Sequence, residues 1–411
     1  MIYFLLFICC YWGLIRDLTI DITPIVVVCL CLLTFLQFIK RVPFKIYPSS
    51  VMFFLMINWL CILLLGSIHN YNYDTFEKGI TQYILFPLVF IVAAKRASCI
   101  NYQNLFRFIS FINIPNLLGS FYEHISGNYI LSTSHIQYLQ DGAIRTAAFV
   151  GDMISLPLIL GFCTLIVLYK CITTKNPIYL FLSILYAAGT FISQSRGPFM
   201  AMVIGAIVML ILLSNKNSTK SILGRNSVIA IIFITLLLWY AYYLIVQTTI
   251  LDNTVFAGFA DRIRTIFIWD NSNGDASNAT RVEIWINMFD MFLSNPWLGI
   301  GIGTTGSDRL VTIGATESAL IKRLVELGLV GMTINLAMYF VMLRTALVNI
   351  RNTHDIKDKE IKIVLFSIVV VILIEGIVLQ IDEYFPATTF MWIAMAYLCS
   401  RSNNIYHLKM K

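Results

Sequence analysis

Charged residues are scarce in this sequence. Of its 411 residues only 12% are Asp, Glu, Lys or Arg, whereas soluble domains average about 25%, and 58% are hydrophobic. The mean hydropathy is +0.79. Apolar runs of roughly 20 residues, the length that crosses a bilayer, recur along the chain, and in hydrocarbon such a run forms a helix because a helix satisfies its own backbone hydrogen bonds. We therefore expect an all-α polytopic membrane protein.

The sequence lacks the signatures of several other protein classes. The nine cysteines contain no C-x-x-C pair and mostly lie inside apolar runs, so neither a zinc site nor a disulfide framework is indicated. The first run has no basic stretch before it and no small-residue cleavage site after it, so we expect a retained span and not a signal peptide. The loops on the basic side are too short for a nucleotide-binding fold, which argues against an ATP-driven transporter.

The apolar runs predict about twelve transmembrane helices, at residues 2–15, 22–39, 50–68, 79–94, 105–122, 147–169, 177–193, 197–214, 227–248, 328–349, 363–381 and 386–400. An even number places both termini on one side. Most of the 29 Lys and Arg residues then fall on that side, and most of the 22 Asp and Glu residues fall on the other. Because cytoplasmic loops accumulate Lys and Arg, we expect cytoplasmic termini. The net charge of +7 is thus an orientation signal and does not indicate a nucleic-acid partner.

The chain is expected to form one integral membrane domain over residues 1–411, with a large outer loop at 249–327. Within this loop, Asn278 or Thr280 can cap an amphipathic helix near 281–293, whose apolar residues recur at helical spacing until Pro296 ends it. Such a helix would lie at the membrane surface.

A glycine-rich stretch follows, Trp297-Leu-Gly-Ile-Gly-Ile-Gly303. It is not a dinucleotide fingerprint, because it follows a helix stop instead of a strand and its spacing is G-x-G-x-G. Two readings remain open: a flexible re-entrant turn, or a loop that lets a lipid-linked substrate approach the backbone closely.

Glu317 comes next. Thr316 is a good cap for the tenth span, which would place Glu317 in the first helical turn at the outer boundary. The carboxylate is either simply favoured there by the helix dipole or acts as a general base.

Three arginines lie at the outer ends of spans: Arg145, Arg196 and Arg281. Each alone can reach a lipid head-group phosphate. Together they suit a diphosphate, because a guanidinium group binds phosphate oxygens in bidentate fashion and keeps its charge.

Candidate sugar-binding residues are Trp285 and Tyr138, whose rings can stack on sugars or belong to an interfacial aromatic belt. Asp382 can bind sugar hydroxyls or lie in a solvated turn. The outer acidic residues show no metal-ligand spacing, so no metal is expected.

These motifs resemble the O-antigen ligase and polymerase superfamily. The resemblance covers roughly residues 140–335 and rests on Ser195-Arg196-Gly197, Arg281-x-x-x-Trp285, Asn295 to Gly303, Glu317, and Glu326-Leu-Gly-Leu-Val-Gly331. It implies a GT-C-like glycosyltransferase fold in the bacterial inner membrane, with a periplasmic active site, undecaprenyl diphosphate as leaving group and no cofactor.

The resemblance also implies roles for residues. Arg196 and Arg281, and less sharply Arg145, match arginines thought to bind the diphosphate. Ligases of the superfamily place a histidine base where this chain has Glu317, and none of its five histidines lies between residues 281 and 331. This departure favours a polymerase of lipopolysaccharide O-antigen or a related glycan, with Glu317 as the base. Implied partners are undecaprenyl-diphosphate-linked oligosaccharides, membrane lipid, a chain-length regulator and a flippase.

Two alternatives stay open. A ligase would transfer the glycan to lipid A core. A flippase or secondary transporter of lipid-linked sugars would place charges near mid-span, where Glu375 is the main candidate.

Overall fold

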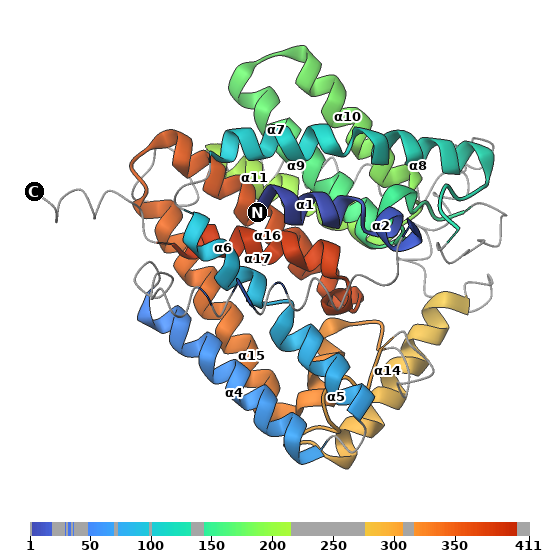
Figure 1. Cartoon of the computed structure of the whole chain (residues 1–411), viewed down its shortest axis with the longest axis vertical. Coiled ribbons are helices and arrows are strands. Elements are labelled where there is room, and N and C mark those ends of the chain that lie inside the picture. The colour runs from blue at the N-terminus through green and yellow to red at the C-terminus, as the bar shows by residue number, and fades with distance from the viewer. Residues whose placement is uncertain are drawn as a thin grey trace, which may run out of the picture.

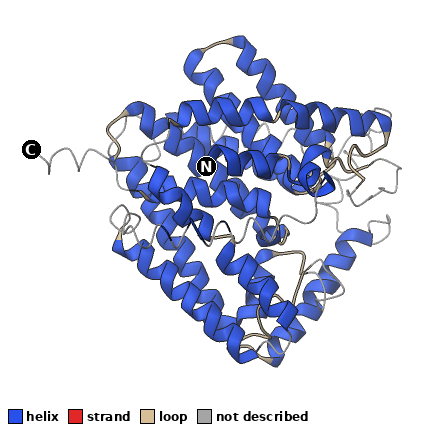
Figure 2. Ribbon diagram, viewed as in Figure 1, coloured by secondary structure: helices blue, strands red, loops and turns tan. Residues whose placement is uncertain are grey.

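The computed structural model describes residues 2–18, 29, 32–33, 36, 48–69, 73–97, 101–132, 144–214, 276–306 and 316–400, and every regular element in these ranges is a helix (Figure 1, Figure 2). The N-terminal half contains α1 (Ile2–Cys10), α2 (Trp12–Leu18), α4 (Ser49–His69), α5 (Tyr73–Ile80), the π-turn η2 (Thr81–Leu85), α6 (Leu88–Ala97), α7 (Tyr102–Ile112), α8 (Ile114–Ser126), the 3-10 turn η3 (Ala148–Val150), α9 (Ser155–Thr174), α10 (Pro177–Ile192) and α11 (Arg196–Ser214). The C-terminal half contains α14 (Ala276–Ser294), α15 (Ala319–Asn352), α16 (Ile356–Val378), the 3-10 turn η6 (Ile381–Glu383) and α17 (Phe385–Cys399).

Within the described residues, six stretches are helical, long and apolar enough to cross a membrane: Ser49–Gly66, Tyr73–Ala93, Ser155–Thr174, Arg196–Ser214, Ala319–Asn352 and Ile356–Val378. Two shorter apolar helices, α10 and α17, accompany them. The all-α polytopic membrane fold is therefore confirmed. The count of twelve stays a prediction, since the expected spans at 22–39 and 227–248 lie outside the described residues.

α17 lies at the centre of the helix bundle. All of its residues are buried, and it packs against α16, α6, α15 and α1. In Figure 1, α16 and α17 lie inside the bundle, while α4 and α15 run side by side along one edge and α14 packs on α15. The loop between α16 and α17 therefore lies at one end of the central, most buried helix.

One expected span is two helices. The run at 105–122 contains α7 and α8, which separate at Asn113. Pro115 lies in the first turn of α8 and has no N–H to donate, so the helix of α7 cannot continue through it. The buried Asn113 side chain donates to the Ile109 carbonyl at 2.9 Å and holds the break in place.

Another expected span begins later than the sequence indicates. The run at 147–169 becomes helical only at Ser155. Residues 144–154 instead form an irregular segment, in which the Asp152 carboxylate accepts the N–H groups of Ile154 and Ser155 at 3.3 and 2.7 Å and so starts α9. Tertiary contacts to this segment, described below, outweigh its apolar composition.

The start of α15 also differs. Ser318 is its N-cap and accepts the Ile321 N–H at 3.4 Å, so the expected cap at Thr316 is wrong and Glu317 lies before the helix with a left-handed φ of 49°. The helix expected near 281–293 is α14, which starts at Ala276, so Asn278 and Thr280 lie inside it and do not cap it.

Candidate functional site

Arg196 opens α11, after a short turn from α10. The turn is tied to the segment before α9, because the Ser195 hydroxyl donates to the Met153 carbonyl at 3.2 Å. The next residue, Gly197, lies directly on a buried carboxylate of α16: a Cβ at Gly197 would lie 2.5 and 2.6 Å from the two oxygens of Glu375. Only glycine admits this approach. The sequence Ser-Arg-Gly therefore places a fixed cation at the end of α11 beside a buried acid.

Arg145 lies in the irregular segment before α9, and a buried acid of α8 anchors that segment. The Glu123 carboxylate accepts the N–H groups of Ala147 and Ala148 at 2.7 and 2.9 Å, and that of Ile130 at 3.0 Å. The Arg145 carbonyl accepts the Tyr129 hydroxyl at 2.8 Å, and that hydroxyl also contacts the Met153 sulfur. Because Met153 contacts both segments, the structure brings the backbone around Arg145 and the Arg196 turn together.

Glu317 is held by the loop between α16 and α17. With its amide oriented to satisfy its neighbours, the Gln380 side-chain oxygen accepts the N–H of Glu317 at 3.0 Å and the Thr316 hydroxyl at 3.0 Å. The Gln380 side-chain nitrogen donates to the Glu383 carboxylate at 2.9 Å. From the other side, the Trp285 indole N–H of α14 donates to the Thr316 carbonyl at 3.1 Å. These bonds fix the unusual backbone of Glu317.

Glu383 is also the centre of a charged network. The Lys322 ammonium donates to Glu383 Oε1 at 2.9 Å and to Gln82 Oε1 at 2.5 Å, and Lys78 lies 3.8 Å from the same Glu383 oxygen. Lys322 is fully buried and the Glu383 side chain is 7% exposed. Since breaking a buried ion pair costs about 3–5 kcal/mol, this network holds α5, η2, α15 and η6 at one place. Gln82 lies in the π-turn η2, an irregularity that recurs at functional sites.

Tyr384 directly follows Glu383 and precedes α17. Burial, followed by the charges of Asp152, Glu383, Glu317 and Glu375 in that order, holds the pKa of the Tyr384 hydroxyl well above its usual value of 10.0. The hydroxyl therefore stays protonated. We call Tyr384 and these four acids the Tyr384 junction. Direct contacts join the segments that carry these residues: Ser195 bonds to Met153, Gly197 packs on Glu375, and Gln380 bonds to both Glu317 and Glu383.

Basic side chains surround the junction. The charge of Arg16, from α2, acts on Asp152, Lys78 and Lys322 lie at Glu383, and Arg196 adjoins the residue that packs on Glu375. Within the part of the chain that the structure describes, no group of three or more His, Cys, Asp or Glu side chains is placed to hold a metal ion.

The remaining sequence candidates are placed only in part. Arg281 lies in α14 one turn before Trp285, which itself contacts Thr316, so its backbone is near the Glu317 segment. Asp382 lies in η6 between Gln380 and Glu383. Tyr138 lies outside the described residues.

The backbone of the glycine-rich stretch packs directly against the backbone of α15 where the two cross. Gly299 and Gly328 touch: a Cβ at Gly299 would lie 2.4 Å from the Glu326 carbonyl oxygen, and one at Gly328 would lie 2.5 Å from the Gly299 nitrogen. The N–H of Gly301 donates to the Glu326 carbonyl at 3.2 Å, and the buried Glu326 side chain accepts the Thr305 N–H and hydroxyl at 2.9 and 2.7 Å. This stretch is thus packed on α15, which accounts for its glycines without a substrate.

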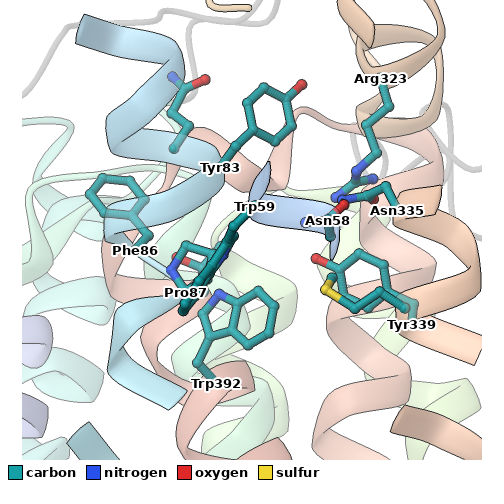
Figure 3. Close-up of a pocket in the computed structure, with 12 residues that line it drawn as sticks. Asn58, Trp59, Tyr83, Phe86, Pro87, Arg323, Asn335, Tyr339 and Trp392 are labelled. Atoms are coloured by element: carbon teal, nitrogen blue, oxygen red, sulfur yellow. The ribbon is translucent and has the colours of Figure 1, made fainter. Parts of the chain in front are cut away.

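A small pocket, lined by both aromatic and polar side chains, lies between α4, η2, α15 and α17 (Figure 3). Its volume is about 10 Å³, close to the space of one water molecule. In Figure 3, Arg323 points toward Asn335 and Asn58, and its guanidinium lies 5.4 Å from the centre of the Tyr339 ring. Asn335 donates to Asn58 at 3.1 Å. The pocket is too small for a sugar, so we assign it a structural role.

Sequence reasoning missed Lys78, Gln82, Glu123, Lys322 and Gln380. The available signal was the run Lys322-Arg323-Leu-Val-Glu326, where three charged residues enter a long apolar helix. Charged side chains within membrane helices face the protein interior and mark function. No comparable sequence pattern indicates a role for Gln82 or Glu123.

Part of the chain matches a known family. Residues 181–336 match the family model described as O-antigen ligase, and no curated protein sequence matches the chain. The matched range includes Arg196, Arg281, Glu317 and the Gly328 crossing, whereas Glu375, Glu383 and Tyr384 lie beyond it. The family covers both ligases and polymerases, glycosyltransferase-like membrane enzymes of O-antigen assembly that act on lipid-linked glycans. The chain therefore carries a domain of the O-antigen ligase family at residues 181–336.

Proposed function

We propose that this chain polymerises lipid-linked oligosaccharide repeat units at the periplasmic face of the bacterial inner membrane. It transfers the growing glycan from undecaprenyl diphosphate to the non-reducing end of another undecaprenyl-diphosphate-linked repeat unit. The observation that supports the proposal is that Gly197, beside Arg196, packs on Glu375 of α16, while Gln380, in the loop after α16, binds the backbone of Glu317.

The arginines supply the electrostatic part of the mechanism. In the transfer, the bond between the anomeric carbon and the diphosphate oxygen breaks, and the oxygen leaves with the electron pair. Arg196 and Arg281, helped by Arg145, would stabilise the charge that develops there. Ser195 and Glu123 hold the segments of Arg196 and Arg145 in place, which supports cations that are positioned before substrate binds.

Glu317 supplies the proton acceptor. As the hydroxyl oxygen of the acceptor sugar bonds to the anomeric carbon, its proton passes to the Glu317 carboxylate. Gln380 accepts the N–H of Glu317, Ser318 caps the helix that follows, and the Glu317 side chain is partly exposed. The Tyr384 hydroxyl, which stays protonated, can donate a hydrogen bond in the same region.

The choice of polymerase over ligase rests on the base. The resemblance places a ligase histidine where this chain has Glu317, and none of its histidines lies between residues 281 and 331. The GT-C-like architecture belongs to the same proposal.

Two substitutions test the site: Arg196→Ala and Glu317→Gln, each expressed in a strain lacking the native gene. We expect surface polysaccharide ladders on a gel to collapse to core capped with a single repeat unit. The matched controls are Arg344→Ala, an exposed arginine of α15, and Glu283→Gln, an exposed acid of α14, both of which should keep full ladders.

Other outcomes would contradict the proposal. Full ladders in both site variants at normal expression would show that the site is wrong. Polymer that accumulates on undecaprenyl diphosphate, with none on lipid A core, would identify a ligase instead.

A transporter remains the rival from another class. It requires Glu375, and this residue now lies against the Arg196 turn, so Glu375→Gln should impair either activity. Glu317→Gln separates the two: a transporter would tolerate it, whereas the polymerase would lose its base.

A further inference from the structure

An apolar groove lies at the opposite end of α9 from the Tyr384 junction. It opens between α7, α9 and α10, with a volume of about 420 Å³, within the range of ligand-binding pockets. Its walls include Phe106, Phe111, Ile114, Val167, Leu182 and Tyr186. Tyr186 is buried, and its hydroxyl donates to the Ser110 carbonyl, which closes the floor between α7 and α10. None of the junction residues lines this groove.

Two cations line the same groove. Arg107, on α7, is exposed, and Lys170, on α9, is half-buried. The ion pairs found among the described residues include neither of them. Two like charges at one groove repel each other, so an anion bound between them would be favoured.

The combination identifies the chemistry of the ligand. A purely apolar groove suits any acyl chain, and isolated cations suit any anion, but a groove with both suits an amphipathic anion. The positive-inside pattern of the sequence places Arg107 and Lys170 on the cytoplasmic side, where basic pockets between membrane helices bind anionic lipid head groups. The exposed Phe111, at one wall, continues the apolar surface outward.

We propose that the groove between α7, α9 and α10 binds one anionic phospholipid, with its phosphate between Arg107 and Lys170 and an acyl chain along the groove. This site is separate from the glycan-transfer site, and it does not depend on the function proposed above. The bound lipid would join α7 and α10 at the end of the bundle away from the junction.

Native mass spectrometry of the full-length protein in detergent micelles tests the proposal. Titration with phosphatidylglycerol should show one retained lipid, and phosphatidylcholine should be retained at least about tenfold more weakly. Arg107→Gln combined with Lys170→Gln should weaken phosphatidylglycerol binding by about tenfold. The matched control, Arg344→Gln with Lys357→Gln, removes one exposed Arg and one exposed Lys from α15 and α16 and should leave binding unchanged.

Two further arms distinguish the sources of binding. Leu182→Trp fills the groove but keeps both cations, and it should also weaken phosphatidylglycerol binding. Inorganic phosphate at the same concentration as the lipid should not displace it. Equal binding of both lipids, an effect of the control pair as large as that of the groove pair, or displacement by inorganic phosphate would each overturn the proposal.

Discussion

Buried charged side chains shape the Tyr384 junction. Lys322, Glu375 and Glu383 lie in or beside helices that are otherwise apolar, and each is placed by a specific neighbour: Gln82, Gly197 and Gln380. Arg196 and Glu317 could be singled out from the sequence because they stand at the outer ends of apolar runs. Their neighbours could not, since each contact joins segments far apart in the chain, and a sequence pattern records only local order.

Asp152 predicts how stability depends on pH. Burial raises the pKa of its carboxyl from 3.8, against the opposing effects of the Ser155 and Ile154 N–H groups and of Arg16. The folded state thus holds the proton more tightly than the unfolded state. The contribution of Asp152 to the free energy of unfolding is fully present below pH 3.8 and is lost as the pH rises through the raised pKa of the folded state. Asp152→Asn keeps a side-chain oxygen that can accept the Ser155 N–H but cannot ionise, so its stability relative to the native protein should increase as pH rises.

Thermal unfolding in detergent between about pH 4 and pH 7 measures this difference. The matched control is Asp355→Asn, at an exposed aspartate that caps α16 by accepting the Lys357 N–H at 3.1 Å. Unfolding midpoints of Asp152→Asn that run parallel to those of the native protein over the whole range would contradict the assignment.

At the scale of elements, the apolar runs predicted where helices lie better than where they break. α4, α10, α11 and α17 begin and end close to the expected bounds. The break between α7 and α8 had a local signal in Pro115. The late start of α9 had none, because it depends on Glu123 of α8 binding the backbone of Ala147 and Ala148.

Replacing the glycine at the kink of α15 should lower the free energy of unfolding more than replacing the glycine that caps α8. Gly328 has a φ of 62° and touches the Gly299 backbone, whereas Gly127, the cap of α8, has a φ of 67° with no atom within 4 Å of its added Cβ. Gly127→Ala therefore meets only the left-handed backbone penalty, about 1–2 kcal/mol. Gly328→Ala meets that penalty and a backbone clash, and we expect it to lower the free energy of unfolding at least twice as much as Gly127→Ala does.

Denaturant unfolding in mixed micelles measures both variants. Equal losses would show that the crossing between Gly299 and Gly328 adapts without strain. A larger loss for Gly328→Ala would establish that the glycine-rich stretch serves packing.

At the scale of the whole molecule, the membrane fold followed from composition, but the assembly of the site did not. Glu317 and Arg196 lie inside the matched family range, whereas Glu375, Glu383 and Tyr384 are contributed by α16 and the loop after it. Long-range packing of α11 on α16 brings them together. The orientation of this assembly in the membrane, with the junction outside, is a prediction from the distribution of Lys and Arg.

α9 offers the means to test that orientation. It is 20 residues long, about 30 Å, and separates two exposed positions: Lys175, its C-cap, and Asn128, in the loop that Tyr129 ties to Arg145. In a background with the nine natural cysteines replaced, Asn128→Cys should react with a membrane-impermeant maleimide in intact cells with a permeabilised outer membrane. Lys175→Cys should react only after lysis, because the basic loops are expected in the cytoplasm. The reverse pattern would place the Tyr384 junction on the cytoplasmic side, where a periplasmic glycan transfer is impossible.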